Sequence, residues 1–248
     1  SARDLGFISN EKMYEMLEKS ILVIRSLKRW NGHLYNWYNI KTLEPLKPAF
    51  ISTVDSGNFV GYLFVVREVL EKENKKELRD AVNEIIVNTD FSKLYDYDKN
   101  LFSIGYDLSE NKLVDSYYDL LASEARQASF IAIAKRDVSY KHWFNLGRSF
   151  TVVDGYKGLV SWAGTMFEYF MPNVIMPSYE YSLLEETYRF CVYSQKEYAR
   201  KLGIPWGISE SAFNLQDLDY NYQYKAFGIP WLGLKRGLKE EVVVAPYA

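Results

Sequence analysis

Apolar residues recur at intervals of three and four positions along much of the chain, a pattern typical of amphipathic helices. In the first such segment, Met13, Leu17, Ile21 and Ile24 fall on one side of a helix. Helices are expected over residues 10–29, from the segment after Gly57 to residue 70, over a segment ending near Asn88, and over residues 115–135, 140–150, 163–170 and 179–202. The pattern therefore predicts an all-α chain of paired helices.

The segments between these helices are long and rich in aromatic residues. Residues 30–52 and 205–237 are expected to be irregular, and Leu101–Tyr106 is expected to form a short strand. The absence of repeats and of a Ser/Gly/Pro-rich linker predicts one domain over residues 1–248. The last residues, 242–248, resemble the opening of another element, so the domain is expected to be truncated at its C-terminus and to belong to a larger chain.

Charge and cysteine content exclude several classes of partner. Lys and Arg number 30 against 32 Asp and Glu, without a basic block, so no nucleic-acid footprint is expected. The one cysteine, Cys191, cannot form an intrachain disulfide. No apolar run approaches the roughly 18 residues of a spanning helix, so the piece is expected to be soluble, without membrane insertion.

Metal and cofactor sites are not predicted. His33, His142 and Cys191 provide no cluster at zinc-ligand spacing. Val54–Gly57 contains the Asp-Ser-Gly of aspartic proteases, but those enzymes are all-β and need a second Asp. The glycines of residues 228–237 match neither phosphate-binding pattern and are interpreted as turns. We expect no metal and no cofactor.

Carboxylates are the remaining candidates for chemistry. If residues 113–135 are helical, Glu124 falls in the middle of the apolar face, where an ionised carboxylate is costly unless it is paired or functional. A pairing with Arg126 would also explain it. Glu210 follows the end of a helix and has a tryptophan and two serines beside it, and its alternative role is a helix cap. Glu168 is a third and weaker candidate.

Aromatic residues make up 17% of the chain, including 21 Tyr. This is more than a core requires, and aromatic faces with polar rims suit carbohydrate rings. Two carboxylates among aromatic loops on a helical scaffold fit glycoside chemistry better than other reaction classes.

Several motifs, in order, resemble the glycoamylase-like domain of cyclic β-1,2-glucan synthases. They are Gly32–Tyr38, Ser52–Asn58, Asp119–Arg126, Trp206–Ala212, Tyr222–Gly228, Leu232–Leu238 and Val243–Tyr247. The resemblance covers residues 10–248. It implies an (α/α) toroid of up to six helical hairpins, here an incomplete one, that cyclises linear β-1,2-glucan by anomer-retaining transglycosylation. It also implies neighbouring glucosyltransferase and phosphorylase-like domains and a place on the cytoplasmic side of an inner-membrane enzyme.

The same resemblance implies that Glu124 is the nucleophile and Glu210 the general acid/base. Their carboxyl groups would then lie about 5–5.5 Å apart. The expected substrate-binding residues are Trp37, Tyr38, Asp55, Asn58, Trp162, Glu168, Trp206, Tyr222, Gln223 and Tyr224. Among these, Asp55 is favoured because its Ser-Gly-Asn surroundings resemble a loop.

Three alternatives stay open. An inverting β-1,2-glucan hydrolase would hold the two carboxyl groups about 6.5–9.5 Å apart, with a water molecule between them. A non-catalytic module would bind glucan for neighbouring domains. An incomplete toroid would have no activity.

Overall fold

The computed structural model describes residues 2–218, 220–245 and 247–248, so Pro246 of the last motif lies outside the described residues. Contacts divide the chain into two compact units that alternate along the sequence. The first comprises Ser1–Asp98, Phe102–Tyr117 and Ile131–Val138, and the second comprises Lys99–Leu101, Tyr118–Phe130 and Ser139–Ala248. The single domain stays a prediction.

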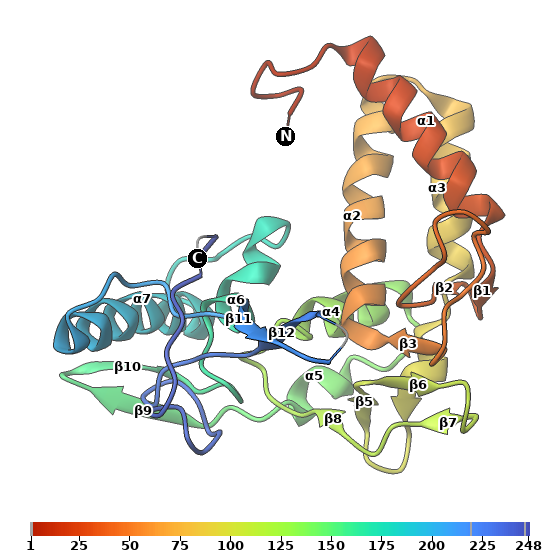
Figure 1. Cartoon of the computed structure of the whole chain (residues 1–248). Coiled ribbons are helices and arrows are strands. Elements are labelled where there is room, and N and C mark those ends of the chain that lie inside the picture. Colours follow the sequence, from red (N-terminus) through yellow and green to blue (C-terminus); the bar gives the residue numbers. More distant parts are fainter. Residues whose placement is uncertain (1, 219, 246) are drawn as a thin grey trace. The chain divides into compact units, whose positions relative to one another are not determined.

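Three helices dominate the first unit (Figure 1): α1 (Asn10–Ser26), α2 (Thr53–Lys72) and α3 (Lys76–Asn88). The helices α2 and α3 pack against each other as a hairpin, and α1 packs on α3. Leu70, Val82 and Ile85 are buried in this unit. The two predicted helices are confirmed, because apolar residues at helical spacing form the packed faces, although α1 ends at Ser26 rather than at Arg29.

The second helix begins earlier than its sequence predicts. Ser52 caps α2, since its hydroxyl oxygen accepts a hydrogen bond from the backbone N–H of Asp55 at 3.2 Å. Asp55 and Asn58 therefore lie in the first turns of a helix, and the expected loop at this position is wrong. Ser56 and Gly57 are buried within this helix.

Short strands occupy much of the sequence expected to be irregular. They are β1 (Arg29–Trp30), β2 (His33–Leu34), β3 (Phe50–Ser52), β4 (Tyr95–Asp96), β5 (Leu101–Ser103), β6 (Gly105–Asp107), β7 (Lys112–Leu113) and β8 (Tyr117–Tyr118). Strands β1 and β2 pair with each other, and two three-stranded sheets have the orders β3-β6-β7 and β4-β5-β8. The strand expected at 101–106 is thus two strands that lie in different sheets. A short 3-10 helix, η1 (Phe91–Leu94), precedes β4.

The long helix expected at 115–135 is wrong in its first half. Only α4 (Arg126–Lys135) is helical there. The backbone N–H of Leu121 donates to Gly147 at 3.0 Å, and the Ser123 hydroxyl oxygen accepts from Ala125 N–H at 3.2 Å. These partners replace intrahelical bonds, so Glu124 lies in the turn before the helix.

The second unit contains α5 (Lys141–Asn145), α6 (Met166–Phe170), the 3-10 helix η2 (Met171–Val174) and α7 (Leu183–Leu202). The helix α7 packs on the hairpin of β9 (Phe150–Val153) and β10 (Tyr156–Leu159) (Figure 1). Phe190 packs so closely on Gly158 that a Cβ there would lie 2.7 Å from its ring. As predicted, α7 ends at Gly203, which has φ of 69°.

A second hairpin, β11 (Ser211–Gln216) with β12 (Tyr222–Lys225), occupies part of the segment expected to be irregular. The rings of Phe213 and Phe227 meet edge to face at 5.3 Å. Phe227 belongs to the apolar core of this unit, with Tyr169, Phe190 and Ile229, and the partly buried Phe213 packs against this core. One face of the hairpin is therefore anchored on the core.

Candidate active site

Glu210 follows a segment that the core holds firmly. Gln195 on α7 is buried, and its amide group both donates to the carbonyl of Ile208 and accepts from its N–H, each at 2.9 Å. The carbonyl of Ile208 also accepts from Met166 N–H at 3.2 Å. The chain is thus fixed two residues before Glu210.

Two tyrosines hold Glu210 itself. The Tyr224 hydroxyl donates to Oε2 of Glu210 at 2.6 Å, and the Tyr247 hydroxyl donates to its backbone carbonyl at 2.8 Å. Burial raises the pKa of Glu210, and the charge of Glu168 adds to this, whereas the bond from Tyr224 and the charge of Lys235 oppose it.

Glu124 lies in the turn before α4, after a segment that pairs with Gly147. The N–H of Gly147 donates to Asp119 at 2.6 Å, and Leu121 N–H donates back to Gly147 at 3.0 Å. The side chain of Glu124 is partly exposed, and the Ser123 hydroxyl donates to its Oε2 at 3.3 Å.

The pKa of Glu124 is raised to about 7. Burial of the carboxyl group is the main cause, and the charges of Glu168 and Glu210 add to it. Glu124 also raises the pKa of Tyr224 through its charge. Glu124, Glu168, Glu210 and Tyr224 thus form one electrostatically connected cluster within the second unit, typical of a functional site.

The carboxylate of Glu168 is bonded to the loop at residues 161–165. It is 6% exposed. Its Oε1 accepts from Ala163 N–H at 3.0 Å, and its Oε2 accepts from the Ser161 hydroxyl and Thr165 N–H, both at 2.9 Å. With Thr165 it forms the capping box of α6. Glu168 thus organises the loop and adds negative charge beside the other two glutamates, and its predicted substrate-binding role stays a prediction.

Arg126 is buried beside Glu124, but it bonds mainly to the backbone. Its guanidinium donates to the carbonyls of Ser123 at 3.1 Å, Glu168 at 3.3 Å and Tyr169 at 2.6 Å. It also donates to the Tyr188 hydroxyl at 3.0 Å. No ion pair within the described residues joins it to Glu124, so the structure does not support the pairing considered from the sequence. Arg126 connects the turn of Glu124 to α6 and α7.

The expected sugar-binding residues of the second unit differ in their surroundings. Trp162 and Trp206 are partly exposed, and Trp162 Nε1 donates to Asp119 at 2.7 Å. On β12, Tyr222 and Tyr224 are exposed and alternate with the less exposed Gln223. The two tyrosines therefore share the open face of the hairpin.

The other expected binding residues belong to the first unit. Trp37 and Asp55 are exposed, and Asn58 is partly buried. The Tyr38 hydroxyl accepts from Tyr35 N–H at 2.9 Å and donates to Lys28 at 2.7 Å, so it shapes its own loop. The approach of these four residues to the glutamates stays a prediction.

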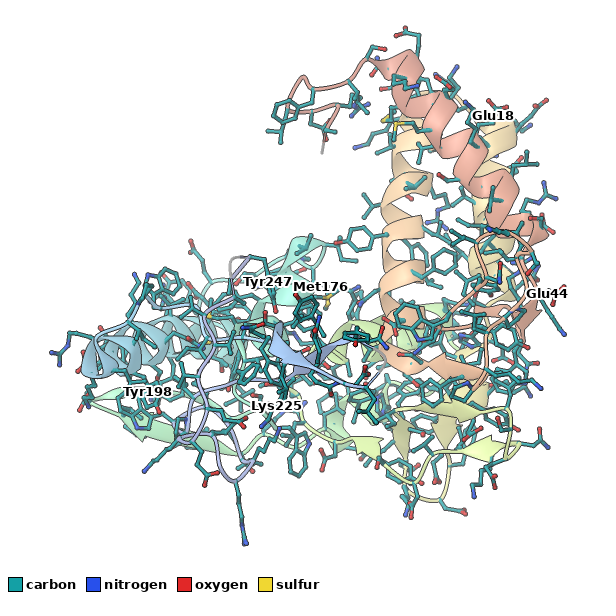
Figure 2. The ribbon with its side chains drawn as sticks, in the orientation of Figure 1. Glu18, Glu44, Met176, Tyr198, Lys225 and Tyr247 are labelled. Carbon is teal, nitrogen blue, oxygen red and sulfur yellow. The ribbon has the colours of Figure 1, made fainter. Side chains whose placement is uncertain are left out.

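Tyr247 and Ser209 are contributors that the sequence reasoning missed. The Ser209 hydroxyl oxygen accepts from Phe167 N–H at 3.0 Å and lies 2.9 Å from the Tyr247 hydroxyl. Figure 2 labels Tyr247 among the side chains of the second unit. The position of Ser209 next to Glu210 in the sequence could have indicated its role. Tyr247 lies far from Glu210 in the sequence, so no local pattern indicates its contact.

No helix among the described residues has the length and apolar character needed to cross a membrane. In the same part of the chain, His, Cys, Asp and Glu side chains form no group of three or more that could hold a metal ion.

A family model named Glycoamylase, with the description "Putative glucoamylase", matches residues 116–248. The chain belongs to this family. The match covers more than half of the chain, including Glu124, Glu168 and Glu210.

Over its whole length the chain is 32% identical to the cyclic β-(1,2)-glucan synthase NdvB of Rhizobium meliloti (strain 1021). The alignment extends over 375 residues, and it spans 13% of that relative. The chain therefore corresponds to a small part of a much longer protein.

Solved structures show the same fold. The chain superposes on the endo-β-1,2-glucanase from Chitinophaga pinensis with a TM-score of 0.72 at 18% identity, covering 94% of this chain and 62% of that one. For the β-1,2-glucanase from Parabacteroides distasonis, the TM-score is 0.74 at 14% identity, covering 93% of this chain and 39% of that one. The predicted fold class, an (α/α) toroid of helical hairpins, is confirmed, and the loops between the helices carry the short β-hairpins.

Proposed function

We propose that this chain acts on linear β-1,2-glucan and cyclises it by anomer-retaining transglycosylation, with Glu124 and Glu210 as its catalytic pair. The observation that carries the proposal is the identity of 32% over the whole chain with a cyclic β-(1,2)-glucan synthase. The connected glutamates of the second unit support it, because glycoside chemistry needs two carboxyl groups in different protonation states.

The electrostatics favour the reverse of the roles that the family resemblance implies. A general acid must hold a proton near neutral pH, and Glu124, with a pKa of about 7, fits this requirement. A nucleophile must be ionised. Burial raises the pKa of Glu210 as well, but the hydrogen bond from Tyr224 and the charge of Lys235 oppose this and favour its charged form. We therefore propose Glu124 as the general acid/base and Glu210 as the nucleophile.

The reaction then has two steps. Protonated Glu124 gives its proton to the glycosidic oxygen as the bond to the anomeric carbon breaks, and a carboxylate oxygen of Glu210 forms a bond to that carbon. In the second step, ionised Glu124 takes the proton of an incoming sugar hydroxyl. The oxygen of that hydroxyl displaces Glu210, and the two inversions leave the configuration retained. When the hydroxyl belongs to the other end of the same glucan, the product is a ring.

The proposed partners follow from the longer relative. Since the chain spans 13% of a synthase, we propose that glucosyltransferase and phosphorylase-like domains of one parent chain supply and process the glucan. The corresponding location is the cytoplasmic side of an inner-membrane enzyme.

Incubation of the chain with linear β-1,2-glucan, followed by mass spectrometry, tests the activity. We expect products one water lighter than linear glucans. NMR of the new anomeric centre gives the configuration of the products. Shortened linear products of inverted configuration would instead establish the inverting hydrolase. The observation behind that alternative is the fold shared with proteins named as β-1,2-glucanases.

Azide rescue tests the two roles. The substrate is the aryl β-glycoside of a β-1,2-linked glucose oligosaccharide, in which the aryl group is a good leaving group. Glu210→Ala with azide should give a glycosyl azide of inverted configuration, because azide replaces the nucleophile. Glu124→Ala with azide should give one of retained configuration, because azide intercepts the glycosyl-enzyme. The opposite pair of products would restore the roles that the resemblance implies.

A further inference from the structure

Tyr224 and Glu210 are brought together by the register of the β11–β12 hairpin. Ala212 pairs with Tyr224, and Ser211 pairs with Lys225, so Glu210 lies diagonally across from Tyr224. An aromatic side chain can reach such a diagonal neighbour. The small side chain of Ala212 stands directly opposite Tyr224.

The hairpin has one anchored face and one open face. Phe213, opposite Gln223, packs on the core through Phe227 at 5.3 Å. On the other face, Tyr224 is 65% exposed although its hydroxyl is bonded to Glu210. The pairing of β12 with β11 thus holds the backbone of Tyr224 in place, and its hydroxyl donates to Glu210.

We propose that Tyr224 is a positioning residue for Glu210: its hydroxyl holds Oε2 of the carboxylate and leaves Oε1 to react with the sugar. The bond is 2.6 Å long, as expected when a hydroxyl donates to a charged oxygen. The inference rests on the proposed function for its catalytic meaning, whereas the hydrogen bond is a property of the fold.

A second set of bonds fixes the backbone of Glu210. Phe167 N–H donates to the Ser209 hydroxyl oxygen, the Ser209 hydroxyl lies 2.9 Å from that of Tyr247, and the Tyr247 hydroxyl donates to the Glu210 carbonyl. Since Tyr247 must donate to the carbonyl, Ser209 donates to Tyr247 in this chain of bonds. With the backbone held in this way, the contact with Tyr224 sets the orientation of the carboxylate.

The charged and titratable groups around Glu210 come from several elements. Glu168 on α6 and Glu124 before α4 bear negative charge when ionised, Lys235 is positive, and Tyr224 and Tyr247 are hydroxyl donors. The pKa of Tyr224 is raised, so it keeps its proton and remains a donor at neutral pH. It thus favours the ionised form of Glu210 against burial and the charge of Glu168.

The test compares Tyr224→Phe with Tyr220→Phe, which removes a hydroxyl from an 81% exposed position between the same two strands. We expect Tyr224→Phe to lower kcat roughly tenfold or more with little change in KM. The acid limb of its pH profile should move to higher pH, since Glu210 loses a bond that favours its charge. Tyr220→Phe should behave as the unchanged chain does.

A measurement independent of turnover separates this inference from the proposed function. NMR titration of the side-chain carboxyl carbons of labelled glutamate, with Glu210 assigned through Glu210→Gln, should show a higher Glu210 pKa in Tyr224→Phe. An unchanged Glu210 titration in the folded variant would overturn the positioning role. If that titration shifts while the unchanged chain leaves β-1,2-glucan intact, the positioning stands and the proposed function fails.

Discussion

The carboxylate of Glu168 raises the pKa of Glu124 even though its own oxygens are bonded to the loop at residues 161–165. Glu168 belongs to the cap of α6, and Glu124 belongs to the turn before α4. Glu168 therefore has two effects. It holds its loop in place, and its negative charge raises the pKa of the neighbouring Glu124.

The alkaline limb of activity should report Glu124. If Glu124 is the acid, the rate falls as pH rises through about 7, because its carboxyl group loses the proton that the leaving oxygen needs. Initial rates on linear β-1,2-glucan from pH 4 to pH 10 provide the measurement. Glu124→Gln should lose nearly all turnover of unactivated glucan while keeping its fold by circular dichroism. Near-normal rates in this variant would contradict the assignment.

Replacing Glu168 by Gln should have two effects. The neutral side chain removes a charge that raises the pKa of Glu124, so the alkaline limb should move to lower pH. It also weakens three buried hydrogen bonds and should lower the free energy of unfolding by about 1–3 kcal/mol. Urea unfolding and the pH profile together check this. A destabilised variant with an unmoved limb would limit Glu168 to its structural role.

Arg126 is expected to be important for stability because it is 1% exposed and links three segments. Arg126→Met leaves buried carbonyls without a donor and should cost about 2–4 kcal/mol in urea unfolding. Arg189→Met is the matched control, since Arg189 pairs with Glu185 at an exposed position and should contribute little. Equal losses in the two variants would argue against the buried network.

His33 should make the stability of the chain depend on pH. Burial lowers its pKa to about 4, against an ordinary value of 6.5. Between pH 4 and pH 6.5 the imidazole is therefore protonated in the unfolded state and neutral in the folded state. The contribution to the free energy of unfolding is complete above pH 6.5 and decreases as the pH falls toward 4. The loss amounts to about 3 kcal/mol. It is measured as the difference in pH dependence of urea unfolding between the unchanged chain and His33→Gln. Identical slopes would show that His33 is not responsible.

The sequence by itself determined the helices whose apolar faces are local patterns, such as α1, α3 and α7 with its terminal Gly203. It also nominated Glu210, through its neighbours Trp206, Ser209 and Ser211, and Glu124, through its place on the apolar face of an expected helix. The premise for Glu124 was wrong, because α4 begins only at Arg126. It failed at residues 115–125, where the backbone bonds to Gly147 rather than to its own helix. Such a partner is invisible to a local pattern.

Only the tertiary structure decided which groups surround each glutamate. Tyr224 reaches Glu210 through strand register, Tyr247 reaches it from a position 37 residues away, and Glu168 acts on both glutamates from the cap of another helix. The protonation of a carboxyl group depends on its desolvation and on the charges and donors within a few ångströms of it. Residues distant in sequence provide these surroundings, so the sequence can nominate the pair, whereas the proposed division of roles depends on the fold.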